Sequence, residues 1–286
     1  MNHQNVRLQS GLYFVATPIG TARDITLRAL DVLASADVIA AEDTRSLRKL
    51  MEIHGVPLKD RNIIAYHDHS GPGTRARLLE AIAAGQSVAY ASEAGMPLIA
   101  DPGYDLNRDA AEAGHMVTCA PGASAVVTAL TLAGLPTDAF FFAGFLPNAT
   151  GARCKRLEEL KQVPGTLVFY ESPKRVQASV RDMATVLGNR TAAMCRELTK
   201  KFEEVRRLPL VDLAQSLEDK PVKGEIVLLV ERAGEVEVSA ADLESDLRVA
   251  LKENSVKDAA DLVSKTHDLP RRKVYQLALQ LGKDAD

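Results

Sequence analysis

The alternation of short apolar runs with amphipathic segments through residues 11–120 constrains the fold more than any other feature of this sequence. Four apolar runs have the length and composition of buried strands: Leu12–Ala16, Val38–Ala40, Ile63–Tyr66 and Val88–Ala91. Segments with a helical period separate them, and the first of these predicts a helix over Ile25–Ser35 with Asp24 as its N-cap. The alternation therefore predicts an α/β fold whose sheet is mostly parallel and covered by helices.

The pattern changes after the dipeptide Pro121-Gly122. Strand-like runs such as Phe140–Ala143 and Ile226–Val230 follow, with fewer helical segments between them, which favours a second α/β domain with a largely antiparallel or mixed sheet. A charged stretch, Ala233–Ser239, then leads to three short helical patterns with helix-turn-helix spacing. We expect an N-terminal α/β domain at residues 11–120, a second α/β domain at 121–233 and a small helical unit at 240–286.

Composition and charge exclude several classes of protein. The chain has 286 residues, of which 46% are hydrophobic and 26% charged, so a disordered protein is not expected. The net charge of −3 means that a nucleic acid would have to be met by a local basic patch. Residues 1–10 lack the apolar core of a signal peptide, and the apolar stretch at 139–146 is too short to span a bilayer. We therefore expect a cytoplasmic protein without a membrane partner.

Common catalytic and metal motifs are missing from the sequence. It contains no P-loop, no G-x-G-x-x-G after the first strand and no G-x-S-x-G elbow. Its three cysteines are isolated, which fits neither a disulfide framework nor a zinc site. His67-Asp68-His69 has metal-ligand residue types, but no further cysteine or histidine nearby completes a shell. We expect no metal.

The segment Ser92–Gly103 predicts a small-molecule site. It follows the apolar run Val88–Ala91 and precedes a helical pattern, so it forms the loop at the end of a buried strand. Two glycines and two prolines within it fix an unusual path and allow close approach of the backbone. Ligands of α/β proteins bind at the carboxyl ends of strands. The alternative is a rigid connection that binds nothing.

Three other strand ends carry residues suited to binding or catalysis. Thr17-Pro18-Ile19-Gly20 is either a turn that opens a ligand crevice or an ordinary connection. Glu42, Asp43 and Arg45 place two carboxylates beside a cation, although Asp43 could simply cap the following helix. Arg196–Lys201 is dense in charge and is either a phosphate or substrate site or a solvated strand end.

Taken together, these motifs resemble one family. Their order and spacing are similar to those of the ribosomal RNA small subunit methyltransferase I family, which has the tetrapyrrole methylase fold. The segments that carry the resemblance are Thr17–Gly20, Ala41–Arg45, Ser92–Gly103, Pro121–Ala125, Gly144–Pro147, Tyr170–Pro173 and Arg196–Lys200.

The resemblance implies a two-domain tetrapyrrole-methylase-like fold with S-adenosylmethionine bound between the domains, a homodimer and no metal. It also implies the reaction, which is methylation of a cytidine ribose 2'-hydroxyl in the 16S rRNA of the small ribosomal subunit. Four positions, Glu93, Met96, Ala123 and Lys174, depart from the residues usual in the family.

The resemblance also implies which residues contact the cofactor. Ile99, Ala125 and Tyr170 would supply an apolar slot for adenine, although core packing is the alternative role for Ile99 and Ala125. The full set of implied cofactor contacts is Pro18, Ile19, Gly95, Met96, Ile99, Ser124, Ala125, Tyr170, Gly224 and Glu225.

Methyl transfer from a sulfonium to a ribose oxygen depends on positioning and on help in removing the hydroxyl proton. We expect Arg45 to hold a substrate phosphate and Lys200 or Asp43 to assist deprotonation; surface ion pairs are the alternative. The wider set of groups that could act on the proton is Glu42, Asp43, Glu171, Glu197 and Lys200.

Two other functions remain open from the sequence. One is C-methylation of a tetrapyrrole (a precorrin or uroporphyrinogen) on the same fold, against which stand the segment Glu42–Arg45 and the C-terminal helical unit. The other is a non-catalytic RNA-binding assembly factor that has lost its cofactor. If the protein binds RNA, either as an rRNA methyltransferase or as an assembly factor, we expect the basic run Arg271-Arg272-Lys273 to contact RNA phosphates.

Overall fold

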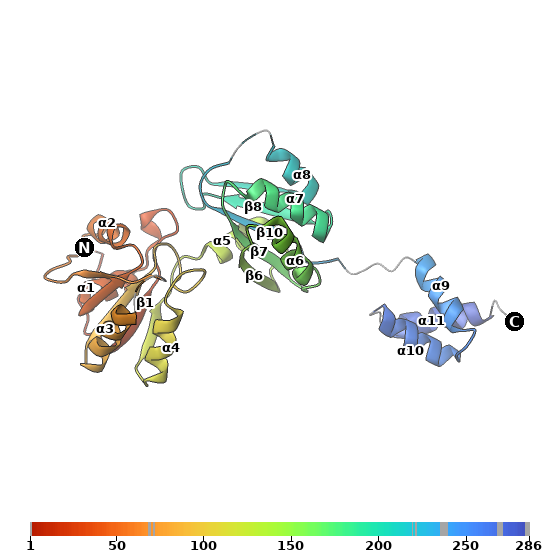
Figure 1. Ribbon diagram of the computed structural model, residues 1–286, viewed down its shortest axis with the longest axis horizontal. Coiled ribbons are helices and arrows are strands. Elements are labelled where there is room, and N and C mark those ends of the chain that lie inside the picture. The colour runs from red at the N-terminus through yellow and green to blue at the C-terminus, as the bar shows by residue number, and fades with distance from the viewer. Residues whose placement is uncertain are drawn as a thin grey trace. The chain divides into compact units, whose positions relative to one another are not determined.

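A computed structural model of the chain describes residues 2–67, 70, 72–218, 220, 222–234, 240–267 and 271–283. The chain divides into two compact units, Met1–Arg232 and Ala233–Asp286 (Figure 1). The larger unit contains two five-stranded sheets, and the smaller one contains helices.

The first sheet is entirely parallel and has the strand order β3-β2-β4-β1-β5. The carboxyl ends of its strands therefore lie along one edge, where the loops that follow β1, β2 and β4 come together. Its strands are β1 (Gly11–Val15), β2 (Val38–Ala41), β3 (Ile63–Ala65), β4 (Ser87–Ala91) and β5 (Val117–Ala120).

Helices cover both faces of this sheet because alternate strand residues are buried on opposite sides. Tyr13 and Val15 of β1 pack with α1 and α2, whereas Leu12 and Phe14 pack with α3 and α4. The helical elements are η1 (Ala22–Asp24), α1 (Leu27–Ser35), α2 (Thr44–Ile53), α3 (Pro72–Ala83) and α4 (Tyr104–Glu112).

The second sheet is mixed and has the strand order β6-β7-β10-β8-β9. Strand β6 runs parallel to β7, and the remaining neighbours are antiparallel. A β-bulge interrupts the pairing of β6 with β7 between Phe142 and Gly144. The strands are β6 (Phe140–Phe145), β7 (Thr166–Glu171), β8 (Thr191–Arg196), β9 (Glu204–Pro209) and β10 (Ile226–Val230).

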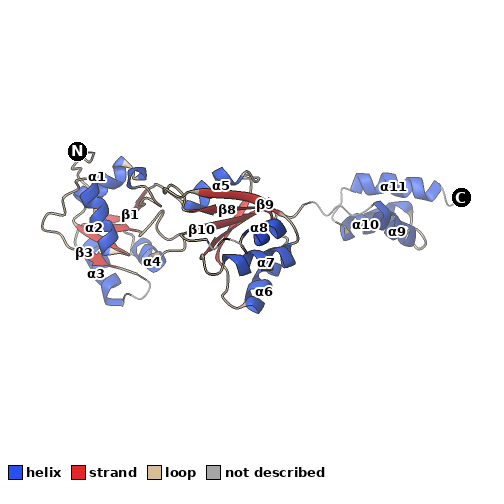
Figure 2. Cartoon of the chain, turned by 90° about the horizontal axis from the view of Figure 1, so that it is seen from above, coloured by secondary structure: helices blue, strands red, loops and turns tan. Residues whose placement is uncertain are grey.

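The two faces of the second sheet are covered by different helices (Figure 2). Helices α6 (Thr150–Leu160), α7 (Val176–Leu187) and α8 (Leu210–Ser216) pack on one face, around Leu157, Met183 and Leu213. Helix α5 (Ala125–Ala133) packs on the other face, and Ile19 from the loop after β1 joins the same apolar cluster.

The smaller unit is formed by α9 (Ala240–Ala250), α10 (Val256–Thr266) and α11 (Arg271–Lys283). Its own core contains Leu247, Ala260 and Val274, which are fully buried. Among the described residues, no helix combines the length and the apolar character needed to cross a bilayer.

The α/β class, the parallel first sheet and the mixed second sheet confirm the sequence-based prediction. The predicted cap of the first helix is wrong: η1 contains Asp24, and Thr26 caps α1 by accepting a hydrogen bond from the Ala29 amide. Threonine has the same capping chemistry, two residues further along the chain. The division into 11–120, 121–233 and 240–286 stays a prediction.

Candidate functional site

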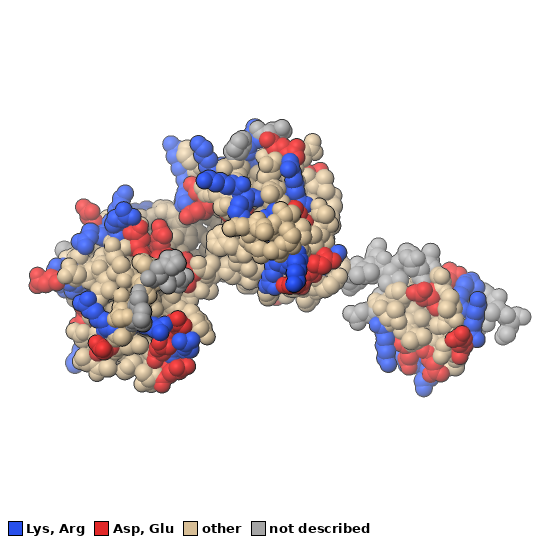
Figure 3. Space-filling view, in the orientation of Figure 1, with Lys and Arg blue, Asp and Glu red and all other residues tan. Residues whose placement is uncertain are grey.

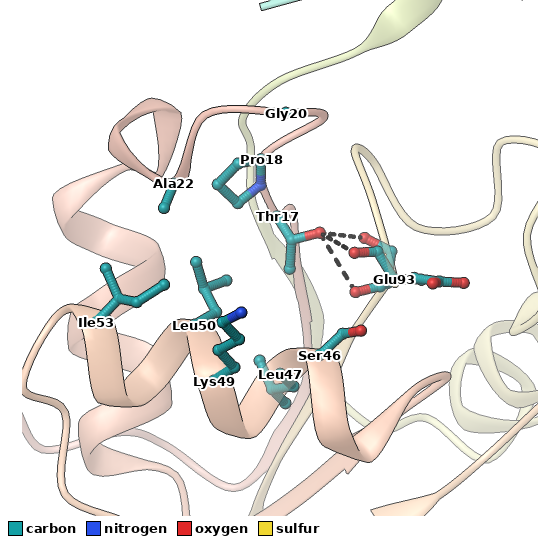
Figure 4. A pocket seen from close by; sticks show the side chains of 11 residues that line it. Thr17, Pro18, Gly20, Ala22, Ser46, Leu47, Lys49, Leu50, Ile53 and Glu93 are labelled. Atoms are coloured by element: carbon teal, nitrogen blue, oxygen red, sulfur yellow. Dashed lines mark hydrogen bonds between the residues drawn. The ribbon is translucent and has the colours of Figure 1, made fainter. Parts of the chain in front are cut away.

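The loop after β1 is tied to the loop after β4 by a short antiparallel bridge. Thr17 and Gly95 exchange two backbone hydrogen bonds of 3.0 Å. The Thr17 hydroxyl lies within hydrogen-bond distance of the Ser92 and Glu93 carbonyls (Figure 4). The Ser92 hydroxyl lies 2.5 Å from the Gly95 carbonyl. These bonds hold two strand-end loops of the parallel sheet in one fixed arrangement.

The Ser92–Gly103 loop has a constrained backbone, as its glycines predict. Gly95 has a φ of 85°, and Leu98 and Ala100 also have positive φ values of 70° and 60°. A non-glycine residue in this region costs about 1–3 kcal/mol, and such strain clusters at functional sites. A Cβ on Gly95 would lie 3.2 Å from Ile19 Cγ2 and 3.4 Å from the Ala123 carbonyl, so the three segments are in close contact.

Several predicted cofactor contacts share one apolar cluster. Ile19 from the loop after β1, Ala125 from α5 and Tyr170 from β7 belong to the apolar cluster between α5 and the second sheet. Burial, with smaller contributions from the carboxylates of Asp101 and Glu225, raises the pKa of Tyr170 to about 12. Tyr170 is therefore neutral at physiological pH and lies near both the Ser92–Gly103 loop and the start of β10.

The loop after β8 contacts the loop after β1. The Thr21 amide donates a 3.1 Å hydrogen bond to the Thr199 hydroxyl. A Cβ on Gly20 would lie 2.7 Å from the Leu198 carbonyl and 2.8 Å from Lys200 Cγ, so only glycine fits there without displacement. Glu197 and Thr199 have positive φ values of 51° and 62°. The loop after β8 therefore follows a path that ordinary residues adopt at a cost.

Glu197, Lys200 and Glu225 form a charged cluster at this junction. Lys200 Nζ lies 3.0 Å from Glu197 Oε1 and 2.6 Å from Glu225 Oε2. Burial by itself lowers the pKa of Lys200, but the hydrogen bonds to Glu225 and Glu197 outweigh it and raise the pKa above 10.5. The Glu225 amide and Lys200 hold the pKa of Glu197 below its ordinary value. The cluster thus fixes a protonated lysine between two carboxylates.

The other predicted cofactor residues lie on these same segments with different exposure. Met96 is partly buried, and Ile99 is 42% exposed. Ser124 stands at the N-cap of α5, where its side chain makes no capping hydrogen bond. Gly224 has a φ of 90° and lies against the side chain of Glu197.

Asp43 and Arg45 lie at the start of α2. Asp43 Oδ1 accepts hydrogen bonds from the amides of Arg45 at 2.7 Å and Ser46 at 3.1 Å, which lower the pKa of this carboxyl. Arg45 is 92% exposed at its side chain and lies 3.6 Å from Asp43. The contacts of the described residues do not join Arg45 to Lys200. Asp43 therefore has the capping geometry that the sequence left open.

Two further carboxylates have structural partners. Glu42 Oε2 accepts a 3.3 Å hydrogen bond from the Glu93 amide, which links the ends of β2 and β4. Glu171 is buried and accepts hydrogen bonds from the Ser179 hydroxyl at 2.5 Å and the Ser172 amide at 2.8 Å. Glu171 thereby ties the end of β7 to helix α7.

A pocket lies between the loop after β1 and helix α2 (Figure 4). Of the predicted cofactor contacts, Pro18 lines it. Ser46 and Lys49, which the sequence analysis did not single out, face it from α2. Their separation of three residues places them on the same face of α2, and this spacing is the sequence signal that could have identified them. The described residues contain no cluster able to hold a metal ion, and Asp68 and His69 lie outside those residues.

Comparison with known proteins identifies the family. The model of the Tetrapyrrole (Corrin/Porphyrin) Methylases matches residues 11–214, which places the chain in that class of methyltransferase. The model of the RsmI C-terminal HTH domain matches residues 237–282. Relatives named "Ribosomal RNA small subunit methyltransferase I" are 46% identical in Mesorhizobium japonicum and 44% identical in Vibrio cholerae. They cover 96% and 94% of this chain and 93% and 94% of their own. The chain belongs to the ribosomal RNA small subunit methyltransferase I family.

Solved structures agree with this fold. The uroporphyrin-III C-methyl transferase from Thermus thermophilus, complexed with S-adenyl homocysteine, superimposes with a TM-score of 0.54 at 18% identity. The match covers 77% of this chain and 97% of that one.

Proposed function

We propose that this methyltransferase transfers a methyl group from S-adenosylmethionine to the ribose 2'-hydroxyl of a cytidine in the 16S rRNA of the small ribosomal subunit. The names of the relatives support the rRNA substrate. The observation that carries the chemistry is the protonated Lys200, held by Glu197 and Glu225 beside the loop after β1.

The residues present fit S-adenosylmethionine. Ile19, Ala125 and Tyr170 offer an apolar surface for adenine, and Tyr170 remains neutral. Gly95 brings backbone close to them, and Ser124 adds a hydroxyl at the N-cap of α5. When bound, the cofactor supplies an electrophilic methyl group on its sulfonium centre, and the rest of the cofactor is a good leaving group because it departs as a neutral thioether. The remaining proposed contacts are Pro18, Met96, Ile99, Gly224 and Glu225.

Lys200 has the charge needed to assist deprotonation of the substrate. A cation close to a hydroxyl stabilises the alkoxide form and so lowers the free-energy cost of losing the proton, which passes to solvent water. Glu197 and Glu225 fix the ammonium group and keep it charged. We assign this role to Lys200 and leave Asp43 as the cap that orients the start of α2.

Helix α2 is the proposed contact for the RNA backbone. Arg45, Arg48 and Lys49 are exposed on it, and phosphate contacts by such cations supply sequence-independent affinity. Acidic residues are interspersed with basic ones over the face seen in Figure 3, so binding would depend on local clusters such as this one. In the smaller unit, exposed residues 271–273 at the start of α11 are the second proposed contact.

A transfer assay with several acceptors tests the proposed function. The protein would be incubated with methyl-labelled S-adenosylmethionine and either unmodified small ribosomal subunits or uroporphyrinogen III. We expect label in the 16S rRNA of the subunits. Label in the tetrapyrrole would establish the C-methyltransferase alternative, and cofactor affinity without any transfer would point to an assembly factor.

We also propose that the protein is a homodimer and that it acts in the cytoplasm. Sedimentation of the purified protein would detect the dimer as twice the monomer mass.

A further inference from the structure

Three aromatic rings meet at the ends of β6 and β7. The Tyr170 ring lies 4.9 Å from the Phe142 ring and 5.6 Å from the Phe145 ring, measured between centroids, with 64° between the planes in both pairs. Phe142 is partly buried, but Phe145 is 57% exposed. Single exposed apolar side chains are common on protein surfaces, so the position of Phe145 beside Tyr170, rather than its exposure alone, indicates a role.

The β-bulge determines which face of the sheet Phe145 occupies. Phe142 pairs with Val168 and Phe145 pairs with Tyr170, so three positions on β6 span two on β7. Without the extra residue, regular alternation would put residue 144 opposite Tyr170 and turn Phe145 to the face covered by α6, α7 and α8. The bulge instead sets Phe145 beside Tyr170. Gly144, whose φ is 67°, supplies the backbone conformation that this requires.

Phe145 thereby adjoins the proposed methyl-donor site. Its neighbour Tyr170 is close enough to Asp101 and Glu225 for their charges to raise its pKa. Glu225 in turn holds Lys200 through a 2.6 Å ion pair. Tyr170 also pairs with Val227 of β10, two residues after Glu225, so the exposed ring lies at the same end of the second sheet as the cation proposed to act on the ribose hydroxyl.

We propose that Phe145 is the stacking platform for the nucleobase whose ribose is methylated. The inference rests on the proposed function. A ribose hydroxyl becomes accessible when its nucleotide leaves the helical stack, and proteins hold such bases on aromatic side chains. Stacking tolerates any base, so Phe145 contributes affinity and positioning, while hydrogen bonds from other groups would select cytosine.

A second copy of the chain is the competing occupant of this surface. Strand β6 is an edge strand, and Phe140 and Phe141 are also exposed on it, at 47% and 38%. Those two rings lie at the other end of the strand, where β6 pairs with Thr166 and Leu167. Phe145 differs from them because the bulge and Tyr170 place it at the candidate site.

Four single variants distinguish these roles: Phe145→Ala, Phe145→Leu, Phe145→Tyr and the matched control Phe140→Ala. Leucine keeps apolar contact with Tyr170 but lacks a flat ring, whereas tyrosine keeps the ring. The readouts are single-turnover methylation of unmodified small subunits, affinity for those subunits with S-adenosylhomocysteine bound, calorimetric affinity for S-adenosylmethionine, and sedimentation.

We expect Phe145→Ala and Phe145→Leu to lower the methylation efficiency about 10- to 100-fold, the range of one lost base stack. Phe145→Tyr should retain activity, and Phe140→Ala should match the parent protein. Cofactor affinity and sedimentation should stay unchanged in all four. Full activity of Phe145→Leu would overturn the proposal, as would a loss explained by weaker cofactor binding or by dissociation of a dimer.

The methylation and subunit-affinity measurements together separate this proposal from the proposed function. If the parent protein methylates subunits and Phe145→Ala does so equally well, the stacking role fails and the proposed function stands. If the parent protein transfers no methyl group to the subunits, the proposed function fails. In that case equal subunit affinity of Phe145→Ala and the parent protein also removes Phe145 as a base contact.

Discussion

Lys200 and Glu225 form a 2.6 Å ion pair between Nζ and Oε2, although they lie 25 positions apart, Lys200 in the loop that follows β8 and Glu225 in the loop that precedes β10. Strand β8 ends at Arg196 and β10 begins at Ile226, and the two strands are antiparallel neighbours. The sheet pairing therefore brings a cation and a carboxylate together at one edge. This arrangement allows the protonation of Lys200 to be tested through its partner.

Glu225→Gln should shift the alkaline limit of the reaction to lower pH. The hydrogen bond that Lys200 donates to Glu225 is the largest of the interactions that raise the pKa of Lys200, so its loss lowers that pKa. A reaction that needs protonated Lys200 would then fail at a lower pH than in the parent protein. Single-turnover rates measured against pH at saturating cofactor would show this displacement. Lys200→Met should lower the rate across the whole range, and a pH profile that is identical in Glu225→Gln would contradict the role of the cation.

Gly20→Ala should disrupt the junction of the two loops. The added methyl group would meet the Leu198 carbonyl at 2.7 Å, and overpacking of this kind costs about 1–3 kcal/mol. We expect a lower free energy of unfolding and weaker binding of S-adenosylmethionine, measured by denaturant titration and calorimetry. Gly151→Ala is the matched control, because a Cβ there meets nothing within 4 Å and Gly151 lies in helix α6. Equal effects of the two substitutions would show that the junction tolerates the extra atom.

The sequence predicted the apolar strands well but missed α6, α7 and α8, the helices on one face of the second sheet. Asp43, which the sequence offered as the cap of the helix that follows it, caps α2 (Thr44–Ile53), where a strong polar and apolar period begins. Helix α6 was missed because its inward positions include Arg153, which is buried and paired with Asp182 of α7 at 2.6 Å. A charged residue at a core position breaks the pattern that identifies a helix.

The candidate site was predictable in its segments but not in its contacts. Gly95 and Pro18 lie on loops that the sequence marked by their residue types. The sequence gives no sign that Glu197 and Thr199 have positive φ values, because glutamate and threonine seldom adopt this backbone conformation. The contact of Lys200 with Glu197 is predictable because the two residues are only three positions apart. The contact with Glu225 becomes evident only once β8 is known to pair with β10.

Substitutions of Asp43 separate capping from chemistry. Asp43→Ala should lower the free energy of unfolding by about 0.5–2 kcal/mol, the usual value of a lost cap, whereas Asp43→Asn retains the capping oxygen and should cost less. Because the pKa of Asp43 is lowered below 3.8, the charged cap should stabilise the protein above that pH and stop doing so as the pH falls below it. Single-turnover rates of Asp43→Asn should equal those of the parent protein. A strong loss of rate in this stable variant would make Asp43 a participant in proton removal.

The basic residues at the start of α11 should control the salt dependence of RNA binding. Arg272 and Lys273 are exposed, whereas Arg271 is paired with Asp261. Replacing Arg272 and Lys273 by glutamine should reduce the slope of log affinity against log salt by about 1–2, since each phosphate contact contributes roughly 0.7–0.9. Binding of the small subunit measured at several salt concentrations gives this slope. Cofactor affinity is the control and should not change, and an unaltered slope would remove this surface from the RNA contact.

The most direct test of the account is to locate the methyl group on the product. Unmodified small subunits would be incubated with the protein and deuterated S-adenosylmethionine, and the 16S rRNA digested to nucleosides for mass spectrometry. The account predicts a single labelled nucleoside, 2'-O-methylcytidine, that is formed by the parent protein and much reduced with Lys200→Met. A label on a nucleobase, on another nucleoside or at equal yield with Lys200→Met would contradict it.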